Sequence, residues 1–284
     1  MSSHSVLRGN VALSSVGPMI WALSAVVANA EVDVAKFITV RPGNIAIIIS
    51  APHGGDRMIP DIAKREDRGQ KFFETVRDQR TAELAELIGK NLERLLGGAP
   101  FIVIAKFDRR QIDANRAAED AFTPPGDGGP KLVYEAYHKA LADAAAEVTR
   151  RWGCGLLLDI HGQARFPDAI VRGTQNGQTV MSLVKRYGEE AVAGPRSFFG
   201  ALGGKGYSIA PTGEGDDRIE RFFQGGHIVD THGSRNGGAV DAIQVEIGAR
   251  HRMPERLEAT ARDLAAAAAV FADAYLPKAK ARGR

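Results

Sequence analysis

Apolar runs of strand length alternate with segments of helical periodicity from residue 31 almost to the C-terminus. Runs of branched aliphatic residues bounded by glycine or proline predict strands, whereas leucines and alanines spaced three and four apart predict amphipathic helices. The predicted strands cover residues 43–50, 100–107, 155–162 and 239–248, and the predicted helices cover residues 78–98, 131–153 and 254–276. This alternation predicts an α/β fold of three αβα layers, with a mostly parallel mixed sheet covered on both faces.

Two glycine-rich segments interrupt this alternation, at residues 118–130 and 193–238. We expect both to form loops at one rim of the sheet. In open α/β sheets, sites form beyond the carboxyl ends of the strands, where such loops gather. The pattern therefore predicts one domain with a cleft built from loops.

The first thirty residues have a different character. Arg8 precedes an uncharged, mostly apolar stretch that ends in the sequence ANA at residues 28–30. This pattern predicts a signal peptide over residues 1–30 and a periplasmic or secreted protein, because it combines a basic start, an apolar centre and an A-x-A end. The alternative is an N-terminal helix that packs on the domain of a cytoplasmic protein. The stretch is short for a stable membrane span, and residues 31–284 are expected to form the single domain.

Composition argues against a disordered chain and against a nucleic-acid-binding protein. A hydrophobic content of 44% with 25% charged residues is ordinary for a globular protein and argues against general disorder. The formal net charge is only +3, and the chain has no zinc-finger spacing and no basic-aromatic stripe, so we expect no nucleic-acid partner. The one cysteine, Cys154, stands in an apolar run and is expected to be buried and inert.

Three predicted strands end in residues that could perform chemistry. His53 follows the first strand, Asp159 and His161 end the third, and Glu246 lies in the last. A carboxylate inside a strand that is buried on both faces is costly unless it is paired, bound to a metal or functionally tuned. Two imidazoles and one carboxylate are the ligands of a catalytic Zn²⁺, and a further carboxylate that does not bind the metal can take a proton from water. The pattern predicts a zinc hydrolase.

The third metal ligand has two candidates. Asp56 lies three residues after His53, and Asp78 stands at the start of the predicted helix 78–98. An aspartate at a helix start also serves as an N-cap, and an aspartate after two glycines also serves in a turn. The spacing alone leaves the choice open.

A candidate for substrate binding follows the second strand, in the sequence FDRRQIDANR at residues 107–116. A guanidinium can hold a carboxylate by two parallel hydrogen bonds, so Arg116, with Asn115 beside it, is predicted to bind a substrate carboxylate. Phosphate-binding glycine loops and the G-x-S-x-G sequence of serine hydrolases are absent from the sequence.

Seven short sequences, in this order, resemble the N-formylglutamate amidohydrolase family. They are SAPHGG, RDQRTAEL, IDANR, YEAYHKAL, LLLDIHG, FFQGGHIVDTHG and DAIQVEIG. The resemblance extends over nearly all of residues 45–276 and implies a catalytic domain with the zinc-carboxypeptidase-like fold, also called phosphorylase/hydrolase-like.

The resemblance assigns roles to individual residues. It implies that His53 and His161 bind zinc and that Glu246 is the general acid and base. It favours Asp78 over Asp56 as the third ligand, because the formylglutamate-type pattern keeps an aspartate at the start of the following helix. Two further assignments concern the substrate: Asn115 with Arg116 as its carboxylate-binding pair, and His138 as a residue that contacts it or supports the site.

The function implied is hydrolysis of the amide bond of an N-acyl amino acid such as N-formyl-L-glutamate, which releases formate and the amino acid. The predicted export signal and the unmatched segment 174–217 leave the substrate open. The alternatives are a zinc carboxypeptidase or cell-wall peptide amidase, and a member of the fold that binds a ligand without catalysis. The sequence predicts no oligomeric state.

Overall fold

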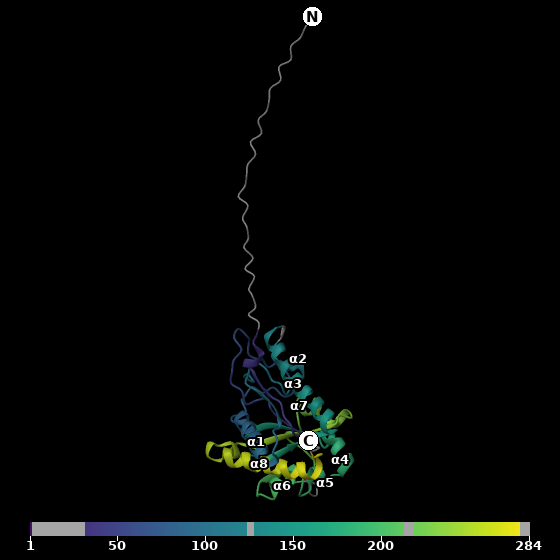
Figure 1. Ribbon diagram of the computed structural model, residues 1–284. Helices are drawn as coiled ribbons and strands as arrows, with labels where there is room; N and C mark the ends of the chain where they lie inside the picture. The colour runs from purple at the N-terminus through teal and green to yellow at the C-terminus, as the bar shows by residue number, and fades with distance from the viewer. Residues whose placement is uncertain (2–31, 124–127, 213–218, 279–284) are drawn as a thin grey trace. The chain divides into compact units, whose positions relative to one another are not determined.

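The computed structural model describes residue 1 and residues 32–123, 128–212 and 219–278 (Figure 1). The chain from Val32 onward forms one compact unit. The predicted signal peptide over residues 1–30 lies, apart from residue 1, outside the described residues and stays a prediction.

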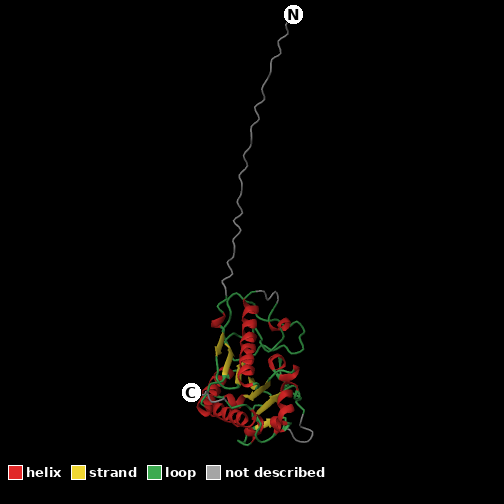
Figure 2. Ribbon diagram, turned by 45° about the vertical axis from the view of Figure 1, so that its right-hand side comes forward, coloured by secondary structure: helices red, strands yellow, loops and turns green. Residues whose placement is uncertain are grey.

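A sheet forms the centre of this unit (Figure 2). It has seven strands in the order β1-β3-β2-β4-β7-β5-β6. The strands are β1 Ile38–Arg41, β2 Ile47–Ala51, β3 Phe101–Ala105, β4 Gly155–Gln163, β5 Ala169–Gly173, β6 Ser208–Ala210 and β7 Val240–Gly248. Strands β3, β2, β4 and β7 are parallel, whereas β1 is antiparallel to β3 and β5 is antiparallel to β7. The predicted α/β fold with a mixed sheet is confirmed.

Helices cover both faces of the sheet. The α-helices are α1 Thr81–Leu96, α2 Ala118–Ala121, α3 Gly129–Trp152, α4 Met181–Tyr187, α5 Glu190–Ala193, α6 Phe198–Gly203, α7 His227–His232 and α8 Pro254–Tyr275. The 3₁₀ turns are η1 Val34–Lys36, η2 Gln178–Val180, η3 Ser234–Asn236 and η4 Ala249–Arg252. Helices α1 and α8 lie together on one side of the sheet, and α3 and α7 lie on the other (Figure 1).

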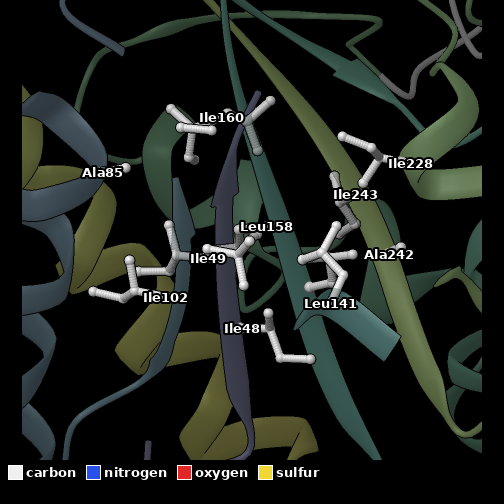
Figure 3. Packing of buried hydrophobic residues seen from close by; sticks show 14 of the residues in the cluster. Ile48, Ile49, Ala85, Ile102, Leu141, Leu158, Ile160, Ile228, Ala242 and Ile243 are labelled. Carbon is white, nitrogen blue, oxygen red and sulfur yellow. The ribbon is translucent and has the colours of Figure 1, made fainter. Parts of the chain in front are cut away.

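Alternation along the central strands supplies the core on both faces. Successive side chains of a strand point to opposite faces. Ile49 and Ile102 are register partners on the side of α1, whereas Ile48 lies on the side of Leu141 in α3 (Figure 3). All of β2, β3 and β7 is buried, as expected for parallel strands between two helical layers.

The same alternation places polar side chains on one face near the carboxyl ends of the strands. Ser50 is the register partner of Asp159, Asp159 is the partner of Gln244, and His161 is the partner of Glu246. Ser50, Asp159 and Gln244 lie two positions beyond Ile48 and its partners, and His161 and Glu246 lie four positions beyond, all on the face that α3 covers. Polar side chains therefore gather at the edge of the sheet where the sequence predicts a cleft.

The structure corrects several predicted boundaries. Helix α1 begins at Thr81 rather than at residue 78, because Arg80 adopts a left-handed φ of 65° and the Asp78 amide donates to the His53 carbonyl (3.1 Å). Asp78 is therefore no helix N-cap. Strands β1, β5 and β6 were not predicted, and the predicted loop 118–130 contains α2 and the start of α3.

Two further observations concern the cysteine and the helices. Cys154 is buried and free, as predicted, and burial raises the pKa of its thiol. None of the helices in the described part of the chain is both long and apolar enough to cross a lipid bilayer.

Candidate metal centre and active site

Two imidazoles meet where β2 and β4 end. His53 follows β2 in a turn whose glycines allow close packing: a Cβ on Gly54 would come within 2.4 Å of the Ala82 amide nitrogen at the start of α1. His161 is the seventh residue of β4. The two rings are buried, with centroids 4.8 Å apart and an interplanar angle of 75°.

Asp78 completes a three-residue cluster. Its Oδ2 lies 3.4 Å from Nδ1 of His53 and 3.4 Å from Nδ1 of His161. Two ligands of a tetrahedral zinc, each about 2.0–2.1 Å from the metal, are about 3.4 Å apart, so these separations match the edges of a coordination tetrahedron. The three side chains converge from two strand ends and one loop, and they form a candidate metal site.

Each imidazole is oriented by a second carboxylate on its other nitrogen. Nε2 of His53 donates to Oδ1 of Asp113 (2.7 Å), and Nε2 of His161 donates to Oδ2 of Asp159 (2.8 Å). An ionised carboxylate can only accept, which leaves both Nδ1 atoms with a lone pair that points at Asp78. Histidine ligands of metals are commonly held in this way, because the outer carboxylate fixes the tautomer and the ring orientation.

The cluster fits a cation on two further grounds. Nδ1 of His53 is buried and has no hydrogen-bond partner among the described residues, which is costly unless another ligand occupies that lone pair. Three carboxylates, those of Asp78, Asp113 and Asp159, also lie against the two histidines, and Arg109 pairs with the first two. Burial opposes ionisation of Asp78 and Asp113, yet hydrogen bonds and charges from the histidines lower the pKa of both carboxyls. Burial lowers the pKa of His161, but the charge and hydrogen bond of Asp159 and the hydrogen bond of Asp78 raise it overall.

Glu246 lies beside this cluster without belonging to it. It is opposite His161 in the β4–β7 register, is buried, and accepts a hydrogen bond from Nε2 of Gln244 (3.0 Å). Burial is the main reason that its pKa is raised to about 7, with a further contribution from the charge of Asp78. A carboxyl with a pKa near neutrality can both accept and return a proton.

The structure separates the two candidates for the third ligand. Asp78 faces both histidines, whereas the Asp56 carboxylate is exposed and accepts from Nη1 of Arg77 (2.8 Å). The His-x-x-Asp spacing therefore leads to a surface ion pair and not to the cluster.

A cavity of about 1130 Å³ opens over the cluster and is lined by Glu246 and Arg116 among others. The Arg116 guanidinium donates to the carbonyls of Phe72 (Nε 3.1 Å, Nη2 2.9 Å) and of Asn115 (Nη1 2.8 Å). These bonds use three of the five N–H groups of a guanidinium. No carboxylate among the described residues forms an ion pair with Arg116, so it presents a positive charge to the cavity.

Asn115 lines the cavity, and its side chain is also held by the protein. Its Nδ2 donates to Oε1 of Gln244 (3.1 Å), and its Oδ1 accepts from the Ile228 amide (2.9 Å). A Cβ on Gly226 would lie 2.3 Å from the Asn115 side chain, so this glycine permits the close approach of α7. The Asn115 side-chain amide therefore links β7 to α7, because both its nitrogen and its oxygen have protein partners.

His138 does not line the cavity. Its Nε2 donates to the Ala114 carbonyl (3.0 Å), and its Nδ1 lies 3.2 Å from Nε2 of His232. His227 also packs against it, with its ring centroid 5.2 Å from that of His138. This histidine cluster, His138, His227 and His232, supports the backbone of the segment that carries Asn115.

The histidine cluster predicts a loss of stability in mild acid. Burial, followed by the charge of neighbouring histidines, lowers the pKa of His138 and of His232 to about 4. In the unfolded chain, histidine has a pKa near 6.5. Between about pH 6.5 and pH 4 the unfolded chain therefore binds more protons than the folded chain. The free energy of unfolding consequently falls as the pH drops through this range. We expect a loss of about 2–4 kcal/mol for the coupled, partly buried pair. Urea unfolding across this window measures it.

The variant His138→Gln provides the control for this prediction. Glutamine keeps an N–H for the Ala114 carbonyl but cannot take up a proton, so the pH slope should become shallower. An unchanged slope would assign the acid sensitivity to other groups.

Several residues of the site were not predicted. Asp113 and Arg109 both lie in the quoted segment 107–116, and Nε of Arg109 donates to Oδ2 of Asp113 (3.0 Å). Ser50 donates to Asp159, and Gln244 contacts Glu246. Their positions offered a signal: Ser50 is the residue before the last of β2, and Gln244 lies two residues before Glu246 and on the same face.

Comparisons with known proteins identify the fold of the chain. A scan against protein-family models finds no matching family, and no curated protein matches the sequence. Among solved structures, N-formylglutamate amidohydrolase from Ralstonia eutropha JMP134 superposes with a TM-score of 0.57 at 17% identity, over 84% of this chain and 98% of that chain. The gene product Atu2144 from Agrobacterium tumefaciens superposes with a TM-score of 0.52 at 13% identity, over 85% and 94% of the two chains. The chain therefore has the fold of N-formylglutamate amidohydrolase, as its ordered motifs predict.

Proposed function

We propose that the protein is a zinc-dependent hydrolase that cleaves the amide bond of an N-acyl amino acid, with N-formyl-L-glutamate as the first substrate to test. One observation carries the proposal. Two buried imidazoles and Asp78 converge with tetrahedral spacing beside a buried Glu246 whose pKa is about 7. The fold shared with an amidohydrolase supports it.

The donor set favours zinc among the common metals. Two nitrogen ligands and one carboxylate oxygen suit Zn²⁺, whereas Mg²⁺ and Ca²⁺ prefer oxygen ligands alone. Such an ion would supply Lewis-acid chemistry, by polarising the acyl oxygen and making water more acidic. Asp113 and Asp159 would hold the two histidines in the tautomer that binds it.

Glu246 would act as the general base and then as the general acid of the reaction. As a base it takes a proton from water, whose oxygen forms a bond to the acyl carbon. As an acid it returns that proton to the amine as the carbon–nitrogen bond breaks, so that water and amide yield a carboxylic acid and a free amine. Gln244 donates to Oε1 of Glu246 and keeps the carboxyl beside the cluster.

Arg116 would orient the substrate. Two of its N–H groups are not used by the carbonyls of Phe72 and Asn115, and no acidic residue in the described ranges neutralises it. A carboxylate of the substrate can take that place, and holding it relative to the acyl carbon supplies orientation.

Formate release from N-formyl-L-glutamate tests the proposal directly. We expect turnover by the zinc-loaded protein, loss of turnover after treatment with a chelator, and recovery when zinc is restored. Stoichiometric zinc with no hydrolysis of any N-acyl amino acid would favour a protein that binds its ligand without catalysis. Cleavage of peptides alone would favour a carboxypeptidase or cell-wall amidase.

A further inference from the structure

The cavity has an apolar rim that a formyl group would not use. The apolar rim consists of Phe72, Val76 and Phe222, which all line the cavity and are 64%, 68% and 44% exposed. Exposed aromatic and aliphatic side chains that gather at a cavity mouth indicate a ligand surface more often than scattered ones do. The cavity, at about 1130 Å³, exceeds the size that a small N-formyl amino acid requires.

Hydrogen bonds to arginines hold one side of the apolar rim. The Phe72 carbonyl accepts from Nε and Nη2 of Arg116 (3.1 and 2.9 Å), and the Val76 carbonyl accepts from Nη1 of Arg109 (3.2 Å). Arg109 also contacts Asp78, with Nη1 3.5 Å from Oδ1. The backbone of this side is thus fixed to the candidate metal centre while the side chains stay exposed.

A buried glutamate holds the other side. The Glu220 carboxylate is 1% exposed and accepts from the Thr174 amide (2.7 Å), from Nε of Arg172 (2.9 Å) and from the Asn176 amide (2.9 Å). Two residues later, Phe222 packs against the ring of Phe166 with a centroid distance of 5.6 Å. Phe222 therefore stands on an anchored segment.

Basic side chains lie beside the apolar rim and form no ion pairs with the described residues. The Arg165 guanidinium lies 4.2 Å from the centroid of the Phe222 ring, and Lys71 lies 5.2 Å from that of Phe72. Arg165 and Arg221 line the cavity and form no ion pair with the described residues. A ligand that complements this surface combines an apolar group with negative charge.

We infer that the substrate is an N-acyl acidic amino acid whose acyl group is bulky and apolar, and that the apolar rim binds this group. The inference rests on the proposed function, because the rim is assigned to the acyl side of the amide cleaved at the metal centre. Arg116 and the unpaired arginines then face the carboxylates, and Phe72, Val76 and Phe222 cover the acyl chain.

A matched substrate series tests the inference. N-formyl-, N-acetyl- and N-octanoyl-L-glutamate all release glutamate, so one assay gives kcat/KM for each with the zinc-loaded protein. We expect the octanoyl compound to exceed the formyl compound by at least about tenfold, since each methylene placed in an apolar site can change the ratio by about tenfold or more. Phe222→Ser should lower the octanoyl-to-formyl ratio by about tenfold, mainly through KM, and Val76→Ser should act in the same direction.

The control is Leu132→Ser, which replaces a similarly exposed apolar residue of α3 that does not line the cavity. It should leave the ratio unchanged. A formyl preference, a ratio that Phe222→Ser and Val76→Ser leave intact, or a preference for glutamyl peptides would overturn the inference while the proposed function stands. Absence of glutamate release from every compound would overturn both.

Discussion

Glu246→Gln is expected to bind zinc as well as the parent protein and to lose most of its turnover. Glutamine has nearly the same shape and can still accept from Nε2 of Gln244, so the packing of β7 should be kept. It cannot take a proton from water or return one to the amine. Loss of general acid and base catalysis typically lowers kcat by about 10²–10⁴-fold. Bound zinc per chain and kcat, measured on the same preparation, separate the two properties.

The control for this experiment is Glu258→Gln on α8. That residue is exposed and does not line the cavity, so both zinc content and kcat should match the parent protein. Undiminished turnover by Glu246→Gln would remove Glu246 from the mechanism. Loss of zinc would show instead that its carboxylate helps to hold the ion.

Asp78→Asn should weaken zinc binding far more than Asp56→Asn. Asp78 supplies the oxygen that lies 3.4 Å from both Nδ1 atoms, whereas Asp56 is paired with Arg77 at the surface. Replacing an outer partner of a metal ligand costs about 10–100-fold in affinity, so replacing a ligand should cost at least about 100-fold. Competition with a zinc-sensitive dye measures the affinity of each variant without reference to activity.

The pair of variants also decides whether the third ligand is Asp56, three residues after His53, or Asp78, before helix α1. Both substitutions remove one negative charge and change little in volume, so Asp56→Asn controls for the loss of an acidic charge near His53. Tight zinc binding by Asp78→Asn together with loss of zinc by Asp56→Asn would assign the ligand to the turn after His53 and would contradict the geometry.

The central strands and long helices could be predicted because their periodicity coincides with their burial. Strand β2 is buried throughout, and helix α1 buries Leu84, Ile88 and Leu92, although Leu95 near its end is 55% exposed. The outer strands gave no such signal. Val40 in the edge strand β1 is 56% exposed, β6 has only three residues, and β5 contains the buried Arg172, whose charge is compensated by Glu220 from a distant segment. Such pairings are set by tertiary contacts, which a local pattern does not contain.

The site could be predicted as a set of residue types but not as a set of contacts. His53, His161 and Glu246 were found because strand ends concentrate functional residues. The residues alone left the choice between Asp56 and Asp78 open, and only the resemblance favoured Asp78. The structure adds the left-handed turn at Arg80, which leaves Asp78 outside helix α1. Asp113 remained hidden between Arg109 and Asn115, because nothing in the sequence shows which of several polar residues in a loop turns inward.

The register of the central sheet has a consequence for the order of folding. His161 reaches the cluster only when β4 pairs with β2 and β7 as observed, since a shift by one residue would turn its imidazole to the opposite face. These strands are far apart in the sequence, so their pairing is a slow, non-local event. High metal affinity therefore arises after the sheet has formed, and a bound ion should slow unfolding while leaving the rate of folding nearly unchanged.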